Sequence, residues 1–184
     1  MLAAGPSGLS VSNGQTYSAT LGLGGNIGDV VDAMRKALDR LHGQPGLQIT
    51  KISSLYKTPP WGIKNQNWFV NSCVEISTSL SPLQLLAECL ETEKHLKRVR
   101  TLRWGPRTID IDVLTIDDYE SDDPKLTVPH PRMLQRAFVL IPLAEITPDL
   151  MIKGENVAHW RDLADRSGIE KIKQDGDWWK PQEL

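Results

Sequence analysis

The alternation of apolar and polar residues predicts four strands in the first two thirds of the chain. Residues 16–24 alternate and lead into the glycine-rich segment GLGGNIGD. Residues 47–58, 68–80 and 108–116 also alternate and are rich in β-branched side chains, as is typical of strands. The segment PPWGIKNQN ends the second strand, because its prolines and glycine cannot continue a hydrogen-bonded ladder.

Two helices are predicted between these strands. Apolar residues recur at helical spacing from about Asp29 to Leu41. A second helix begins at Ser81, which is followed by a first-turn proline and by Gln84, the partner expected in a capping box. Its apolar positions are Leu83, Leu86, Ala87 and Leu90, and it proceeds toward Leu96.

The last third of the chain predicts helical additions. Residues 131–146 indicate two helical pieces broken at Pro142, and residues 156–168 indicate a late helix capped by Asn156. The preceding order of strand, helix, strand, strand, helix and strand is that of a split βαβ arrangement. We therefore expect an α+β, ferredoxin-like sandwich with a mostly antiparallel sheet, helices on one face and the C-terminal additions, which leaves the other face for a site.

Composition bounds the class of protein. The 184 residues suit one domain, expected over residues 16–184, after a flexible N-terminal arm at 1–15 that is rich in glycine, serine and asparagine. A net charge of −2 provides no overall attraction to nucleic acid or to an anionic membrane. The sequence shows no apolar run of about 20 residues and no secretory pattern. Two cysteines, Cys73 and Cys89, are expected to be reduced and buried. The expectation is a cytoplasmic monomer.

Two carboxylates share one face of the predicted strand 108–116. Asp110 and Asp112 alternate with Ile109, Ile111 and Val113, so the aspartates point away from the core. Carboxylates about 6.6 Å apart along a strand can share a pair of hard cations, with waters and substrate phosphates as the other ligands. A solvated polar face of an edge strand is the plainer alternative.

A run of cations leads into this strand. Residues 94–107, KHLKRVRTLRWGPR, contain six lysines and arginines and no acid. Surface ion pairs add little stability, whereas guanidinium groups bind phosphate oxygens through paired hydrogen bonds. A basic, solvated loop is the alternative, but together with the aspartates the run favours binding of a Mg-nucleoside triphosphate. The chain has no GxxxxGK[ST] motif, which excludes a Walker-type site.

Four segments, taken in their order along the chain, resemble a known family: LGLGGNIGD, SSLYKTPPWG, RWGPRTIDIDVL and LTVPHPRMLQRAFVLIPLAEI. Over about residues 20–150 the chain is similar to the 6-hydroxymethyl-7,8-dihydropterin pyrophosphokinases of folate biosynthesis. The resemblance implies a ferredoxin-like fold and transfer of the pyrophosphoryl group of ATP to the hydroxymethyl group of the pterin, releasing AMP. It also implies two Mg²⁺ ions as cofactors, bound with ATP.

The resemblance assigns roles to particular residues. Asp110 and Asp112 are expected to hold both Mg²⁺ ions, and Arg98 and Arg107 to act catalytically on the triphosphate. The residues expected to contact ATP are Glu93, Arg100, Trp104, Thr127, His130 and Arg136. The residues expected to bind the pterin are Thr58, Pro59, Trp61, Phe69, Asn71 and Phe138, with the two phenylalanines on either side of the ring.

Other interpretations remain open from the residues alone. A lone phenylalanine is more often part of a core, although Phe69 shares a strand face with Asn71, an awkward neighbour in a dry core. A metal-dependent nucleotidyl- or glycosyltransferase would use the paired aspartates but would not explain the aromatics beside Asn71. An RNA-binding ferredoxin-like module calls for a basic surface, which a sequence pI of about 6.1 disfavours.

Overall fold

The structure, a computed structural model, describes residues 15–60, 65–96, 106–173 and 178–180. The strands are β1 (Tyr17–Gly25), β2 (Leu47–Ile52), β3 (Leu55–Thr58), β4 (Phe69–Thr78), β5 (Asp110–Ile116), β6 (Ser121–Asp123), β7 (Leu126–Val128), β8 (Met151–Ile152), β9 (Glu155–Asn156) and β10 (Glu170–Lys173). The helices are α1 (Val30–His42), α2 (Pro82–His95), α3 (Ala137–Ile146) and α4 (Val157–Leu163), with a short 3₁₀ helix at Met133–Gln135.

The central sheet is antiparallel and has the order β10-β3-β4-β1-β5, with β2 also paired to β4. Strands β2 and β3 lie one after the other along the same side of β4, because the chain breaks between them at Ser53 and Ser54. The sequence predicts one strand over 47–58, so that prediction is wrong at these two serines. The mixed α/β architecture with an antiparallel sheet is confirmed.

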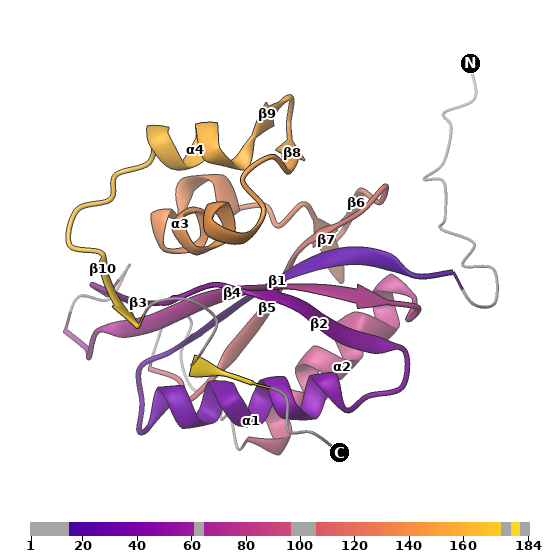
Figure 1. Ribbon diagram of the computed structural model, residues 1–184, viewed down its shortest axis with the longest axis horizontal. Helices are drawn as coiled ribbons and strands as arrows, with labels where there is room; N and C mark the ends of the chain where they lie inside the picture. The colour runs from indigo at the N-terminus through magenta and orange to yellow at the C-terminus, as the bar shows by residue number, and fades with distance from the viewer. Residues whose placement is uncertain (1–14, 61–64, 97–105, 174–177, 181–184) are drawn as a thin grey trace.

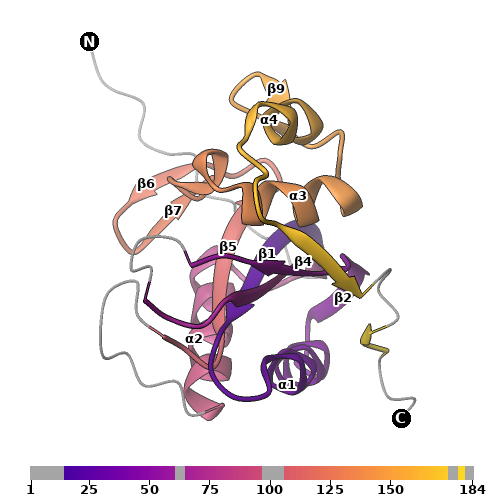
Figure 2. The ribbon, with the colours of Figure 1, turned by 90° about the vertical axis from the view of Figure 1, so that its left-hand side faces the viewer.

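Helices cover both faces of the sheet (Figures 1 and 2). Helices α1 and α2 enclose the larger apolar core, to which β5 contributes Ile109, Ile111 and Val113 as predicted from alternation. Helices α3 and α4 enclose a second core on the opposite face, which includes Cys73 and Leu114. The sequence suggested that this face would be free for a site. The C-terminal helices cover part of it, so only the rest of the face is free.

The C-terminal additions differ from their predicted form. Residues 137–146 form one helix with Pro142 inside it, and the break falls at Arg136, between the 3₁₀ helix and α3. The predicted break at Pro142 is wrong, because apolar packing on both sides of the proline holds the helix together. Asn156 caps α4 as predicted, through its side chain and the backbone N–H of His159 (2.8 Å).

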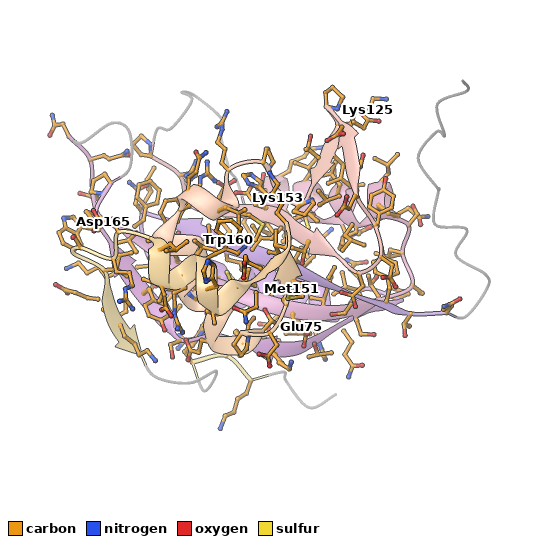
Figure 3. All side chains as sticks on the ribbon, turned by 90° about the horizontal axis from the view of Figure 1, so that it is seen from above. Glu75, Lys125, Met151, Lys153, Trp160 and Asp165 are labelled. Carbon is orange, nitrogen blue, oxygen red and sulfur yellow. The ribbon has the colours of Figure 1, made fainter. Side chains whose placement is uncertain are left out.

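Viewed from above, Trp160 of α4 lies over the sheet, and Lys125 lies apart from it at the tip of the β6–β7 hairpin (Figure 3). Trp160 Nε1 donates to Ile152 O (2.9 Å) and so ties α4 to the β8–β9 hairpin. Among the described residues, no helix is both long and apolar enough to cross a bilayer. Cys73 and Cys89 are free and buried, as predicted.

The cap of α2 is confirmed, and only some of its apolar positions face the core. Ser81 and Gln84 form the capping box, with Ser81 N donating to Gln84 Oε1 (2.8 Å). The residues that α2 buries are Pro82, Leu85, Cys89, Thr92 and Glu93, and Leu86 packs against the core, whereas Leu83 and Leu90 are exposed. A polar residue, Glu93, thus occupies the inner face where the sequence pattern favoured leucines.

Leu85→Ala tests which face of α2 is buried. Leu85 is 0% exposed and Leu83 is 54% exposed. We expect Leu85→Ala to lower the free energy of unfolding by about 2–5 kcal/mol through lost burial and an incompletely filled cavity. Leu83→Ala is the matched control and should change it by less than about 0.5 kcal/mol. Urea unfolding of both variants measures this, and equal losses would contradict the assigned face.

Candidate active site

Strand β1 lies between β4 and β5 and carries glycines where the three strands meet. Gly24 pairs with Asn71 of β4 on one side and with Asp110 of β5 on the other. Two residues earlier, Gly22 pairs with Cys73 and with Asp112. Residues two apart share a face of a strand. On this face, the glycines of β1 therefore leave a surface without side chains between the residues of β4 and those of β5.

The side chain of Asn71 occupies the space above Gly24. A Cβ atom at Gly24 would lie 2.6 Å from Asn71 Oδ1, closer than any normal contact. Asn71 Nδ2 donates to Thr58 Oγ1 (2.7 Å), so the amide is held in this position from β3. The close neighbour that the missing side chain of Gly24 makes room for is therefore this amide.

Asp110 and Asp112 lie together at the start of β5. On the same face, the next residue is Leu114, which is buried under α3, so the strand changes from polar to apolar where the helix begins to cover it. Burial and the neighbouring charge of Asp110 raise the pKa of Asp112 to about 6, although the guanidinium groups of Arg136 and Arg107 act in the opposite direction. Two carboxylates in this position favour a bound cation.

Arg107 is held at the site through its backbone. Its N–H donates to Asn26 Oδ1 (2.9 Å), and its carbonyl accepts from Asn26 N (2.9 Å) and Ile27 N (3.2 Å). Asn26 is buried and its Nδ2 also donates to Asn67 O (2.9 Å), so it joins the glycine-rich segment to both neighbouring loops. These contacts fix the position of the Arg107 backbone, from which the side chain extends.

The guanidinium of Arg107 lies between a carboxylate and an aromatic ring. Its Nη1 is 3.3 Å from Asp110 Oδ2, and its Cζ is 5.2 Å from the centre of the Phe69 ring. The buried Nε has no hydrogen-bond partner in the described part of the chain. A donor of this kind suits an anion such as a phosphate.

Arg136 makes a similar bridge from the other side. It is the N-cap residue of α3, its Nη1 is 3.9 Å from Asp112 Oδ2, and its Cζ is 5.6 Å from the centre of the Phe138 ring. Each aspartate of β5 therefore has an arginine beside it, and each arginine has a phenylalanine beside it.

Two cavities adjoin at Arg136 and Phe138. The smaller has a volume of about 30 Å³, and its lining includes six predicted site residues: Asn71, Arg107, Asp110, Asp112, Arg136 and Phe138. Gly22, Gly24 and Cys73 also line it. The larger, of about 440 Å³, is lined on one side by residues 58–60 and on another by residues 134–138, and residues 163–169 contribute its outer wall. Thr58, Pro59 and Phe138, all predicted to bind the pterin, line this larger cavity.

Three residues predicted to contact ATP line neither cavity. Glu93 lies buried beneath the aspartate strand, where its Oε1 accepts from Ile111 N (2.8 Å). Thr127 Oγ1 donates to Asp123 O within the β6–β7 hairpin (3.1 Å). His130 N donates to Leu114 O (2.8 Å), and burial together with nearby arginines lowers the pKa of its imidazole to about 4. Their contacts with ATP stay predictions.

Four predicted site residues lie outside the described residues: Trp61, Arg98, Arg100 and Trp104. In the described part of the chain, no cluster of three or more His, Cys, Asp or Glu side chains has the geometry of a metal site. The sequence reading missed the role of Asn26, for which the only signal was a polar residue inside a glycine-rich segment. Gly24 was noticed only as part of that segment.

The antiparallel α/β fold and a site of paired carboxylates and arginines define a transferase that handles phosphate groups. The chain belongs to the 7,8-dihydro-6-hydroxymethylpterin-pyrophosphokinase (HPPK) family, whose family model matches residues 20–148. The reaction of this family is pyrophosphoryl transfer to hydroxymethyldihydropterin, so the chain is a kinase of folate biosynthesis.

Curated relatives agree with the family match. A 2-amino-4-hydroxy-6-hydroxymethyldihydropteridine pyrophosphokinase of Methylorubrum extorquens is 48% identical over 155 residues, which cover 84% of this chain and 98% of that protein. A protein of the same name from Bacillus subtilis is 47% identical over 161 residues, which cover 84% of this chain and 95% of that protein.

A solved structure shares the fold. The wild-type HPPK-DHPS protein of Plasmodium falciparum superposes with a TM-score of 0.65 at 16% sequence identity, over 83% of this chain. The present chain spans only 45% of that longer protein.

Gly24→Ala tests the close approach of Asn71. The added methyl group would displace the Asn71 amide from Thr58, so we expect the Kd for 6-hydroxymethyl-7,8-dihydropterin to rise about tenfold, as for one lost hydrogen bond. Calorimetric titration in the presence of Mg²⁺ and a non-hydrolysable ATP analogue measures the change. The control is Gly43→Ala, at the exposed end of α1 with φ −79°. Unchanged pterin affinity in Gly24→Ala would contradict the role of this approach.

Proposed function

We propose that the chain transfers the pyrophosphoryl group of ATP to the hydroxymethyl oxygen of 6-hydroxymethyl-7,8-dihydropterin, with Mg²⁺ as cofactor and AMP as the leaving group. The observation that carries the proposal is the lining of one cavity by two aspartates, two arginines, an asparagine and a phenylalanine. The charged groups match a metal-bound triphosphate. The amide and the aromatic ring match a flat heterocycle with polar edges.

The donor set at the start of β5 fits Mg²⁺. Asp110 and Asp112 supply carboxylate oxygens, the ligands that Mg²⁺ prefers, and waters and phosphate oxygens commonly complete its shell. The raised pKa of Asp112 reflects burial beside a like charge, and a cation between the carboxylates would relieve that repulsion. Bound Mg²⁺ would supply charge neutralisation on the phosphates and would orient them.

Arg107 is proposed to stabilise the charge that moves during transfer. A bond forms between the hydroxymethyl oxygen and the β-phosphorus, and the hydroxyl proton passes to water. The bond from the β-phosphorus to the oxygen bridging the α-phosphate breaks, and negative charge grows on AMP. Arg107 has an anchored backbone and a guanidinium 3.3 Å from Asp110. Its side chain can therefore contact phosphate oxygens held beside that carboxylate. Arg98, outside the described residues, is proposed to act with it.

Asn71, Thr58 and the two phenylalanines are proposed to bind the pterin. The amide of Asn71 is fixed by Thr58 and offers hydrogen bonds in the plane of a heterocycle. The rings of Phe69 and Phe138 each have a guanidinium near one face, at 5.2 and 5.6 Å, so that face is not occupied by apolar core residues. A planar pterin could stack in place of these cations. Pro59 and Trp61 are proposed to complete the pterin site from the neighbouring loop.

We also infer that the fold is ferredoxin-like. The order β5-β1-β4-β3, with α1 after β1 and α2 after β4, supports this assignment. A cytoplasmic location is proposed from the two reduced, buried thiols, which are typical of that compartment. A monomeric state and the N-terminal arm at residues 1–15 stay predictions from the sequence.

Asp110→Ala tests the reaction and its metal requirement together. The wild-type chain, incubated with MgATP and 6-hydroxymethyl-7,8-dihydropterin, should release AMP only when the pterin is present, and EDTA should stop the release. We expect Asp110→Ala to lower the rate at least about 100-fold, since a metal ligand is lost. Asp162→Ala, which removes an exposed carboxylate of α4, should retain the wild-type rate. Release of ADP, or AMP release independent of the pterin, would overturn the proposed reaction.

Arg107→Ala tests the role in charge stabilisation. By analogy with arginine residues that stabilise phosphoryl transfer, we expect kcat to fall about 10³-fold. The Kd for the pterin should change by less than about threefold. Arg107→Lys keeps the charge but not the paired donors and should give an intermediate rate. Single-turnover AMP release separates chemistry from binding, and a near-normal rate in Arg107→Ala would refute the assignment.

A further inference from the structure

The carboxylate of Glu145 on α3 accepts an unusually complete set of hydrogen bonds from the sheet. Its Oε1 accepts from Ser54 Oγ (2.6 Å), and its Oε2 accepts from Ser54 N (3.1 Å) and from Tyr56 Oη (2.7 Å). The Nζ of Lys171 on β10 lies 3.7 Å from Oε1. Both carboxylate oxygens of Glu145 therefore accept from protein donors.

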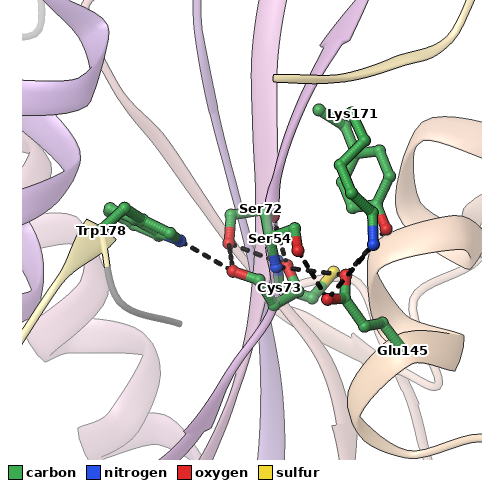
Figure 4. Close-up of polar contacts among 8 residues, drawn as sticks. Ser54, Ser72, Cys73, Glu145, Lys171 and Trp178 are labelled. Atoms are coloured by element: carbon green, nitrogen blue, oxygen red, sulfur yellow. Dashed lines mark hydrogen bonds and ion pairs between the residues drawn. The ribbon is translucent and has the colours of Figure 1, made fainter. Parts of the chain in front are cut away.

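Ser54, which donates two of these hydrogen bonds, lies at the break between β2 and β3. Ser53 Oγ accepts from Cys73 N (2.9 Å) and so replaces a backbone partner that the interrupted strand cannot offer. On the opposite face of the sheet, Trp178 Nε1 donates to Ser53 O (2.7 Å). Figure 4 shows Trp178 and Glu145 on the two sides of Ser54. The break is therefore held from both faces.

The two elements that Glu145 joins carry opposite walls of the larger cavity. Strand β3 ends at Thr58, the residue that holds the amide of Asn71. Helix α3 begins beside Arg136 and Phe138, two turns before Glu145. Both Thr58 and Phe138 line the cavity. Ser54 lies just before β3, whose last residue, Thr58, belongs to one wall. The contact between Glu145 and Ser54 therefore joins this strand to helix α3, whose first turn belongs to the other wall.

Apolar packing alone would not set this spacing. Helix α3 rests on the sheet through residues such as Val139, Leu140 and Leu143, and the free energy of burying them depends on the area removed from water and not on direction. Hydrogen bonds to a carboxylate are directional and strong. The first turn of α3 is also weakly tied to its own helix, because Pro142 has no N–H to donate to the carbonyl of Phe138.

We propose that Glu145 is a positioning residue for the pterin: by joining α3 to the break before β3, it sets the distance between the Thr58 wall and the Phe138 wall. The proposal rests on the proposed function. Of the described residues expected to hold the metal and the triphosphate, only Arg136 lies at the start of α3, whereas Asp110 and Asp112 belong to β5. The metal-triphosphate end of the site therefore depends less on Glu145 than the pterin end does.

The test compares steady-state kinetics of Glu145→Gln, Tyr56→Phe, the double variant and the wild type. Glutamine keeps the size of the side chain but presents an N–H₂ group to donors that need an acceptor. We expect Glu145→Gln to raise the KM for the pterin about tenfold, with kcat and the Kd for MgATP changed less than about threefold. Tyr56→Phe should shift KM in the same direction by less. The double variant should shift KM by less than the product of the two single effects, because both changes act on the same hydrogen bond.

Glu155→Gln, an exposed glutamate of β9, is the control and should behave as the wild type. Thermal unfolding identifies any variant that loses the fold, and Tyr56→Phe keeps the test valid if Glu145→Gln is destabilised. An unchanged pterin KM in both single variants, or an equal rise in the Kd for MgATP, would overturn the positioning role. A wild-type chain that releases no pterin-dependent AMP would overturn the proposed function, and the positioning role with it.

Discussion

The antiparallel pairing of β1 with both β4 and β5 is the constraint on which the site depends. One register places Asn71, Gly24 and Asp110 in a row across three strands, and the next row on the same face is Cys73, Gly22 and Asp112. A shift of one residue would turn every one of these side chains to the other face. The register is held by the apolar residues between them, such as Leu21, Leu23 and Ile111, which are buried against α1 and α2. The core thus determines where the polar groups meet.

The position of α3 decides how much of this face is available. The helix covers Cys73 and Leu114 and begins beside Arg136 and Phe138, so the polar residues lie just beyond its first turn. Apolar burial draws the helix onto the sheet, and the carboxylate of Glu145 supplies the direction that burial lacks. The apolar residues of α3 therefore hold the helix on the sheet, and Glu145, near its end, is proposed to set its position along the sheet.

The electrostatics of the site are balanced in pairs. Each aspartate of β5 lies beside one arginine, Asp110 beside Arg107 and Asp112 beside Arg136, which limits the cost of burying like charges together. In the proposed function, cations on the carboxylates would leave the same arginines available to a polyphosphate. An arrangement in which the arginines can pair either with the carboxylates or with phosphates suits a site that would bind and release a highly charged substrate.

Much of this could be predicted from sequence alone, because it depends on residues close together in the chain. Alternation placed Ile109, Ile111 and Val113 in the core and the two aspartates on the opposite face, and local capping signals located the starts of α2 and α4. Motif resemblance indicated the family, which the comparisons confirm. The tertiary structure alone decided which face of α2 is buried, that α3 continues through Pro142, and that Gly24 adjoins Asn71. The contact between Ser54 and Glu145 spans 91 residues of sequence. Such pairs depend on how the layers pack, and no local pattern of apolar and polar residues records that packing.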